Sequence, residues 1–140
     1  MAFSAARNGE RGMKVSRFMG LAAMAMGLAT AGAAQAQGAD PAVRGKLLFL
    51  QCAACHAVVP GAPAKVGPNL SGVFGRKSAA VAGFRYSPAL AKAGLNWDEG
   101  NLDKWLTSPA KLVPGTIMLF PGLPKPEDRK AVIAYIKTVK

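Results

Sequence analysis

The chain has 140 residues, of which 18 are Lys or Arg and 7 are Asp or Glu, so its formal net charge is +11. This length suits one domain, and a charge of this size bears on solubility and partners rather than on fold. With two cysteines and one histidine in the whole chain, a structural zinc site built from four Cys or His ligands is excluded.

The first 36 residues have the pattern of a secretory signal peptide. They begin with four basic residues, Arg7, Arg11, Lys14 and Arg17. A run of apolar and small residues follows from Leu21 to Ala34, and Ala34-Gln35-Ala36 resembles a cleavage site. The run is shorter than the ~20 residues that span a bilayer. We therefore predict a cleaved leader over residues 1–36 and one domain over 37–140, with an uncleaved anchor as the alternative.

Export limits the partners of the remaining chain. Residues 37–140 carry fourteen basic and six acidic residues, a net charge of +8. We expect this part in the periplasm, as a monomer without stable membrane insertion. Nucleic acid is a poor partner class, because the chain is exported and carries no recognisable nucleic-acid-binding motif. Acidic surfaces on other proteins are better candidates.

The first predicted helix starts at Asp40-Pro41, where an N-cap residue precedes proline at the first helical position. Its apolar residues recur at helical spacing. They are Val43, Leu47 and Leu50, and Leu48 and Phe49 broaden this face. The helix leads directly into Cys52.

Both cysteines and the only histidine lie in one pentapeptide, Cys52-Ala53-Ala54-Cys55-His56. This order and spacing is that of c-type haem attachment, in which the two thiols form thioethers with the haem and the imidazole binds its iron. A disulfide is a poorer interpretation, because so short a loop stabilises little and His56 is left unexplained. A redox Cys-x-x-Cys pair would need a βαβ context, which the chain lacks. We therefore predict one covalent haem c.

Glycine and proline interrupt residues 57–86, where neither helical nor strand periodicity persists. A loop of this length is unusual in a compact domain unless it wraps around a large apolar group such as haem. Further helices are predicted from Ser87-Pro88 to near Gly94, over residues 98–107, and from Pro126 to the carboxyl end. A second loop, 109–124, precedes the last helix, whose apolar stripe is Val132, Ile133, Ile136 and Val139. The pattern predicts an all-α fold.

Met118 lies in the second loop and is the only methionine after residue 36. A lone methionine usually fills a gap in the core. Here, however, six-coordinate iron would need a second ligand, and Met118 is expected to pair with His56, with a lysine amine as the alternative. Such a pair raises the reduction potential and leaves no open position. We therefore expect an electron carrier and not an enzyme; the alternatives are a peroxidase or gas-binding haem protein, or a haem subunit of a larger redox complex.

The chain resembles the short, soluble, mitochondrial-like class I cytochromes c of bacteria. The matching segments are collinear and cover residues 37–140 almost entirely: 52–56, 66–70 (Val-Gly-Pro-Asn-Leu), 74–77 (Phe-Gly-Arg-Lys), 83–86 (Gly-Phe-Arg-Tyr), Trp97, 113–118 (Val-Pro-Gly-Thr-Ile-Met) and 128–135 (Asp-Arg-Lys-Ala-Val-Ile-Ala-Tyr). The resemblance implies a fold in which the first and last helices cross near Gly45, Phe49 and Tyr135, with shorter helices and loops around one haem.

The resemblance also implies roles for individual residues. The Pro68 carbonyl would hold the second ring nitrogen of His56. Arg76, Tyr86 and Trp97 would hold the haem propionates, although both aromatic residues could simply belong to the core. Thr116 would line the methionine side of the pocket. Around the exposed haem edge, three lysines would meet acidic partners: Lys65, Lys111 and Lys125.

Three residues depart from the family pattern. Trp105 replaces a tyrosine near the methionine sulfur, Leu90 replaces an asparagine that orders water, and Ile117 replaces the lysine before the axial methionine. The pocket is therefore expected to be drier than is usual in the family. Lys111 is then the only lysine left in the ligand loop, and our hypothesis is that it replaces Met118 on the iron at high pH.

Overall fold

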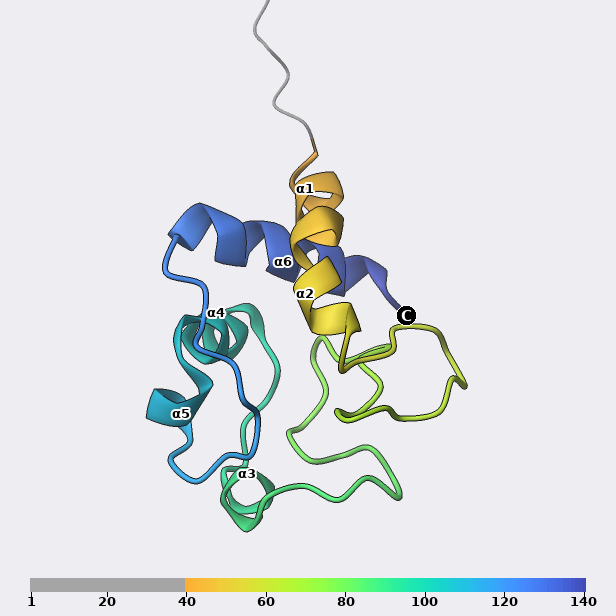
Figure 1. Cartoon of the computed structure of the whole chain (residues 1–140), viewed down its shortest axis with the longest axis vertical. Coiled ribbons are helices and arrows are strands. Elements are labelled where there is room, and N and C mark those ends of the chain that lie inside the picture. The colour runs from red at the N-terminus through yellow and green to blue at the C-terminus, as the bar shows by residue number, and fades with distance from the viewer. Residues whose placement is uncertain (1–39) are drawn as a thin grey trace, which may run out of the picture. The chain divides into compact units, whose positions relative to one another are not determined.

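The computed structural model describes residues 40–140, and the predicted leader lies outside them. This part of the chain contains six helices: α1 (Pro41–Leu48), α2 (Leu50–Ala53), α3 (Pro88–Lys92), α4 (Glu99–Thr107), α5 (Pro109–Leu112) and α6 (Pro126–Thr138). Within residues 40–140, β pairing is limited to an isolated antiparallel bridge between Lys77 and Asn96. The all-α prediction is therefore confirmed, and long loops connect the helices (Figure 1).

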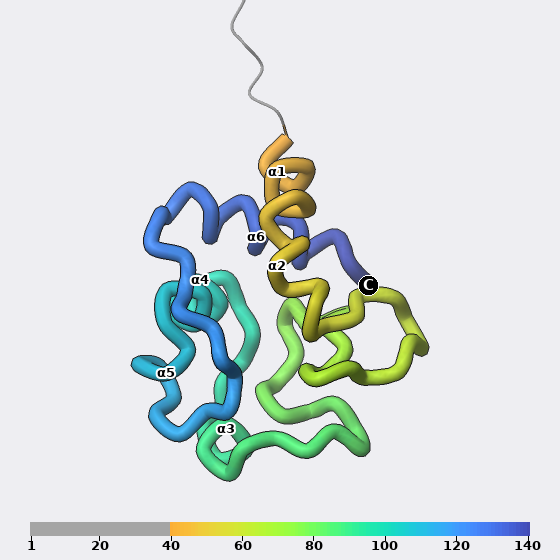
Figure 2. The backbone as a smooth tube through the Cα atoms, in the orientation of Figure 1, coloured from red at the N-terminus to blue at the C-terminus, as the bar shows by residue number. Residues whose placement is uncertain are grey.

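Helices α1 and α6 cross each other, as Figures 1 and 2 show. The crossing depends on Gly45, because a Cβ atom at this position would lie 1.9 Å from the backbone oxygen of Ala131 in α6. Phe49 follows α1 and packs on Tyr135, with their ring centroids 5.2 Å apart. At the other end of the crossing, Arg44 forms an ion pair with Asp128. The first and last helices thus meet where the resemblance implied.

The packed side of α1 differs from its apolar stripe. Val43, Leu47 and Leu50 are between 58% and 67% exposed, whereas Phe49 is 3% exposed and Gly45 is buried. Periodicity correctly located the helix, but it did not identify the side that contacts α6. The reason is that close helix packing here uses a residue without a side chain.

Helices α1, α3, α4 and α6 begin where the sequence predicts. The side chains of Asp40, Ser87 and Asp98 accept hydrogen bonds from backbone N–H groups two or three residues later, which caps α1, α3 and α4. Helix α5 is an addition to the prediction, which treated residues 109–124 as a loop. It is a single turn that starts at Pro109, where proline is well tolerated.

The core lies between α4, α6 and the loop segments packed on them. Its buried members include Leu102, Trp105 and Leu106 of α4 and Val132, Ile133 and Ile136 of α6. Arg129 is also buried, and its guanidinium donates to Asp103 at 2.7 Å and to the carbonyls of Leu123 and Pro124. This arginine joins α6 to α4 and to the end of the second loop. Among residues 40–140, no helix is both long and apolar enough to cross a membrane.

Candidate functional site

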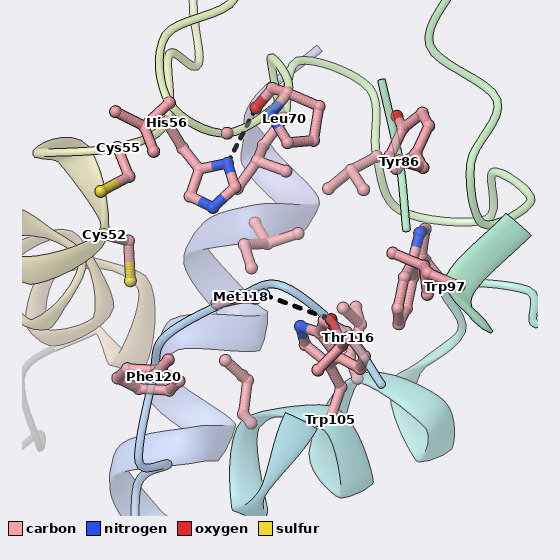
Figure 3. A pocket seen from close by; sticks show the side chains of 18 of the residues that line it. Cys52, Cys55, His56, Leu70, Tyr86, Trp97, Trp105, Thr116, Met118 and Phe120 are labelled. Carbon is pink, nitrogen blue, oxygen red and sulfur yellow. Dashed lines mark hydrogen bonds between the residues drawn. The ribbon is translucent and has the colours of Figure 1, made fainter. Parts of the chain in front are cut away.

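A cavity of about 360 Å³ lies within the described part of the chain, a volume in the range of sites for small molecules and cofactors. Most of its lining is apolar, including Leu70, Leu90, Leu102, Trp105 and Phe120. Figure 3 shows two segments facing each other across it, one carrying Cys52, Cys55 and His56 and the other carrying Thr116, Met118 and Phe120. The site residues predicted from the sequence are therefore found around one cavity.

The first segment is a tight turn at the end of α2. The N–H groups of Cys55 and His56 both donate to the carbonyl of Cys52, at 3.0 and 2.9 Å. This turn places the two thiols on the same side of the histidine (Figure 3). Burial, followed by the neighbouring Cys55, raises the pKa of the Cys52 thiol to about 11, so it is protonated at neutral pH.

His56 is 9% exposed and its Nδ1 atom lies 2.8 Å from the carbonyl oxygen of Pro68. A carbonyl can only accept, so Nδ1 carries the proton and Nε2 keeps a free lone pair. Figure 3 shows that second nitrogen directed toward the segment of Met118. Burial lowers the pKa of His56, which favours the neutral imidazole that a metal requires.

Gly67 holds the other side of the imidazole, a role that the sequence analysis missed. A Cβ atom here would lie 2.3 Å from Cε1 of His56, closer than any side chain can approach. The N–H of Gly67 also donates to the Cys55 carbonyl at 2.8 Å. The Gly67-Pro68 pair therefore supports the ring from one side and orients it from another. Its sequence signals were a Gly-Pro dipeptide, in a loop that is rich in both residues, and its place in the 66–70 segment that matches the family pattern.

Side chains alternate along the second segment. Thr116, Met118 and Phe120 are half-buried, whereas Ile117 and Leu119 are exposed. In an extended chain successive side chains point to opposite sides. Met118 thus lies on the more buried side of its segment with Thr116, whose hydroxyl accepts the Met118 N–H at 3.4 Å, and both residues line the cavity.

The residues expected to hold propionates also line the cavity. Arg76 donates to the carbonyls of Ser71 and Asn69, at 3.0 and 3.2 Å, which engages two of its five N–H groups. The hydroxyl of Tyr86 accepts the Val81 N–H at 3.3 Å. Trp97 meets Trp105 edge to face, with ring centroids 5.2 Å apart. Each polar group is thus placed by loop backbone or by an aromatic neighbour, with its side chain on the cavity.

The three lysines predicted for docking lie outside the cavity lining. The ammonium of Lys65 donates to the carbonyl of Ala53 at 2.7 Å, at the end of α2. Lys111 is exposed in α5, and Lys125 is exposed at the N-cap of α6. The three lysines therefore lie on three separate segments of the chain and outside the cavity lining.

These residues fit a haem. An apolar cavity suits its flat macrocycle, two thiols on one edge suit its vinyl groups, and a neutral imidazole faces a thioether segment across the cavity. The close approach of Gly67 to the imidazole fits a ring held in one fixed orientation, as metal-binding histidines are.

Comparison with known proteins agrees with this site. The profile of the family described as Cytochrome c matches residues 42–140. Cytochrome c2 of Rhodoblastus acidophilus is 49% identical over 96 residues, which cover 69% of this chain and 90% of that protein. Cytochrome c of Nigella damascena is 46% identical over 103 residues, covering 74% and 93% of the two chains. Among solved structures, cytochrome cH from Methylobacterium extorquens aligns with a TM-score of 0.66 and 44% identity, covering 69% of this chain and 97% of that one.

Proposed function

The chain belongs to the class I cytochromes c, electron carriers with a covalently bound haem c, and we propose that its iron is held between His56 and Met118. Its relatives are electron carriers and not enzymes, which sets aside the peroxidase alternative. In this proposal Cys52 and Cys55 form the two thioethers. The cofactor is further bound by Pro68 through His56, by Arg76, Tyr86 and Trp97 at the propionates, and by Thr116 beside Met118.

One observation supports the ligand pair most strongly. After residue 36 the chain has a single histidine and a single methionine, 62 positions apart, and both line the same apolar cavity from facing segments. Of the other lining residues that could bind iron, Cys52 and Cys55 form the thioethers in this proposal, and Lys77 follows Arg76 in a different loop from Met118.

The residues around the site would favour one-electron transfer by holding the ligands in the same positions in the Fe(II) and Fe(III) states. When bound, haem supplies an iron that cycles between Fe(II) and Fe(III), and thioether ligation favours Fe(II). Pro68 and Gly67 hold the imidazole in one orientation, so the ring does not need to turn when the charge changes. The apolar lining would keep water from the iron, and binding by both His56 and Met118 would leave no position for oxygen or peroxide. These features suit a carrier.

We assign this carrier to the periplasm, as a monomer exported by the predicted leader. Its electron partners would be redox proteins with acidic docking surfaces, attracted by Lys65, Lys111 and Lys125. The support is chemical: the part following the leader has a net charge of +8, and all three lysines are exposed. Opposite charges raise the rate at which such proteins meet.

The optical spectrum tests the ligand pair. We expect the oxidised protein to show the near-infrared Met-to-iron band, and the reduced protein to bind no carbon monoxide. Met118→Ala should abolish the band and admit carbon monoxide, because it removes the thioether and opens the site. A wild-type protein that lacks the band, or binds carbon monoxide readily, would contradict the pair.

A further inference from the structure

The side-chain amide of Asn69 fixes the loop of residues 57–86 by three hydrogen bonds. Its nitrogen donates to the carbonyls of Val59 and Ala62, at 2.8 and 2.9 Å, and its oxygen accepts the Ser71 N–H at 2.8 Å. A carbonyl can only accept and a backbone N–H can only donate, so these partners require both ends of an amide. Asn69 therefore ties the turn that begins at Val59 to the backbone that follows Asn69 itself.

Arg76 is held by the backbone that this amide fixes. Its guanidinium donates to the carbonyl oxygens of Ser71 and Asn69, at 3.0 and 3.2 Å. The hydrogen bond from the Ser71 N–H to the Asn69 side chain closes a turn between these two residues, which sets the positions of both carbonyls. The amide of Asn69 thus holds the Arg76 side chain indirectly, through the backbone.

Arg76 is one of two basic residues that line the cavity. The other is Lys77, and no carboxylate belongs to the lining formed by residues 40–140. Lys77 is exposed, so water and salt screen its charge, whereas Arg76 is half-buried and is screened less. A guanidinium also stays protonated in proteins. Arg76 is therefore the better screened from solvent of the two positive charges beside the cavity, and it acts at every pH.

A fixed positive charge at this cavity affects the reduction potential of an iron bound there. Fe(III) carries one more positive charge than Fe(II), so a nearby guanidinium destabilises the oxidised state and favours the reduced one. A guanidinium that moves outward is farther from the iron and more strongly screened by water. The potential therefore depends on where the guanidinium of Arg76 is held.

We propose that Asn69 is a positioning residue that raises the reduction potential of the haem by holding the Arg76 guanidinium at the cavity. The inference rests on the proposed function, which places a haem in the cavity and Arg76 at its propionates. Without the amide, the carbonyls of Val59 and Ala62 and the Ser71 N–H lose this partner. The loop then loosens, and the two carbonyls that hold Arg76 move with it.

A double-substitution cycle of reduction potentials tests this route. Potentiometric titration of the holoprotein gives the potentials of the wild type, Asn69→Ala, Arg76→Gln and the double variant. We expect Asn69→Ala to lower the equilibrium constant for reduction at least about threefold, which is about 28 mV at 59 mV for each tenfold change. In the Arg76→Gln background the same substitution should not lower the potential further, because the charge through which it acts is gone.

Thr107→Val is the control for losing a side-chain hydrogen bond to the backbone. The Thr107 hydroxyl donates to the Asp103 carbonyl at 2.8 Å, and Thr107 is exposed in α4 and does not line the cavity. Valine keeps the shape of threonine without the hydroxyl. The potential of Thr107→Val should therefore equal that of the wild type.

Asn69→Ser provides a milder change if Asn69→Ala does not fold. A serine hydroxyl can still accept the Ser71 N–H, although more weakly, but it cannot replace both amide donors. Asn69→Ser should therefore lower the potential by less than the alanine variant, and only when Arg76 is present.

Equal shifts in potential from the Asn69 substitution with and without Arg76 would overturn the proposal, because a loop that merely admits water acts independently of the guanidinium. A wild-type potential in Asn69→Ala, or in Arg76→Gln, would also overturn it. Each of these results leaves the ligand pair His56 and Met118 intact. A wild-type protein that lacks the Met-to-iron band would instead contradict the proposed function.

Discussion

Gly67 shows how one residue without a side chain positions a ligand. Its Cα lies so close to the imidazole of His56 that an added Cβ would stand 2.3 Å from Cε1. The ring cannot move far, because the Pro68 carbonyl holds its Nδ1 on another side. Two adjacent loop residues, Gly67 and Pro68, therefore set the orientation of the imidazole.

We predict that Gly67→Ala displaces the imidazole and destabilises the fold by about 1–3 kcal/mol, the usual cost of overpacking. Gly100→Ala is the matched control, since an added Cβ there meets nothing closer than 3.6 Å and α4 favours alanine. The free energy of unfolding in denaturant measures both. Equal stabilities of the two variants would contradict the role of Gly67.

Lys111 allows a prediction about alkaline pH. A lysine amine binds iron only when deprotonated, so replacement of Met118 by Lys111 would occur as the pH rises. Lys111 is exposed in α5, six residues before the cavity-lining Ile117, so the loop must rearrange for it to reach the site.

We therefore expect Lys111→Ala to move the loss of the Met-to-iron band to higher pH, by roughly one unit. Lys92→Ala, which removes an exposed lysine of α3, serves as the control. A transition that is unchanged in Lys111→Ala would refute the hypothesis.

At the scale of elements, the second loop is fixed to α4 close to its methionine. The N–H of Leu123 donates to the Leu106 carbonyl at 2.7 Å, and the preceding Gly122 lies against the same helix end. A Cβ atom at Gly122 would stand 2.0 Å from the Thr107 oxygen. Arg129 strengthens this attachment from α6 by donating to Leu123 and Pro124.

Gly122→Ala should therefore push the loop off α4, weaken the Met-to-iron band and lower stability. Gly115→Ala separates this clash from backbone strain, because both glycines have positive φ (+105° and +88°) but an added Cβ at Gly115 approaches only to 3.3 Å of Ala89. We expect Gly122→Ala to cost at least about 1–3 kcal/mol more than Gly115→Ala. Similar unfolding free energies and bands in the two variants would show that the attachment does not depend on Gly122.

Sequence patterns predicted where helices start better than they predicted which residues form contacts between helices. The starts of four helices were predictable, because a capping side chain or a proline in the first turn acts locally on its own helix. These residues are Asp40, Ser87, Asp98 and Pro126. The packed side of α1 was not predictable in the same way, since its contact with α6 is made by Gly45, which carries no hydrophobic signal.

The same limit applied around the site. Its chemically distinctive residues were identifiable from the sequence, because the chain has two cysteines, one histidine and, after residue 36, one methionine. Gly67 and Arg129 were not, because a loop glycine and a charged residue on a helix normally indicate a turn and a solvated surface. Only the tertiary packing reveals that one supports the imidazole and the other is buried.

For the whole molecule, we expect the positions of the charged side chains to affect the rate of electron transfer with charged partners more than the net charge does. We predict that replacing Lys65, Lys111 and Lys125 together by alanine slows oxidation by anionic ferricyanide at low ionic strength, because the local attraction is lost. Replacing three exposed lysines elsewhere, Lys46, Lys92 and Lys130, removes the same net charge. The first variant should be slower than the second by about threefold or more at low salt, and the difference should vanish near 1 M salt. Equal rates at low salt would contradict a local role.

We propose that His56 and Met118 together hold the iron of a one-electron carrier. A potentiometric titration followed by absorbance tests it most directly, on the wild type and on Met118→His. We predict one single-electron transition in each, with the Met118→His transition lower by more than about 0.1 V, because imidazole favours Fe(II) less than thioether does. An unchanged potential in Met118→His would contradict it.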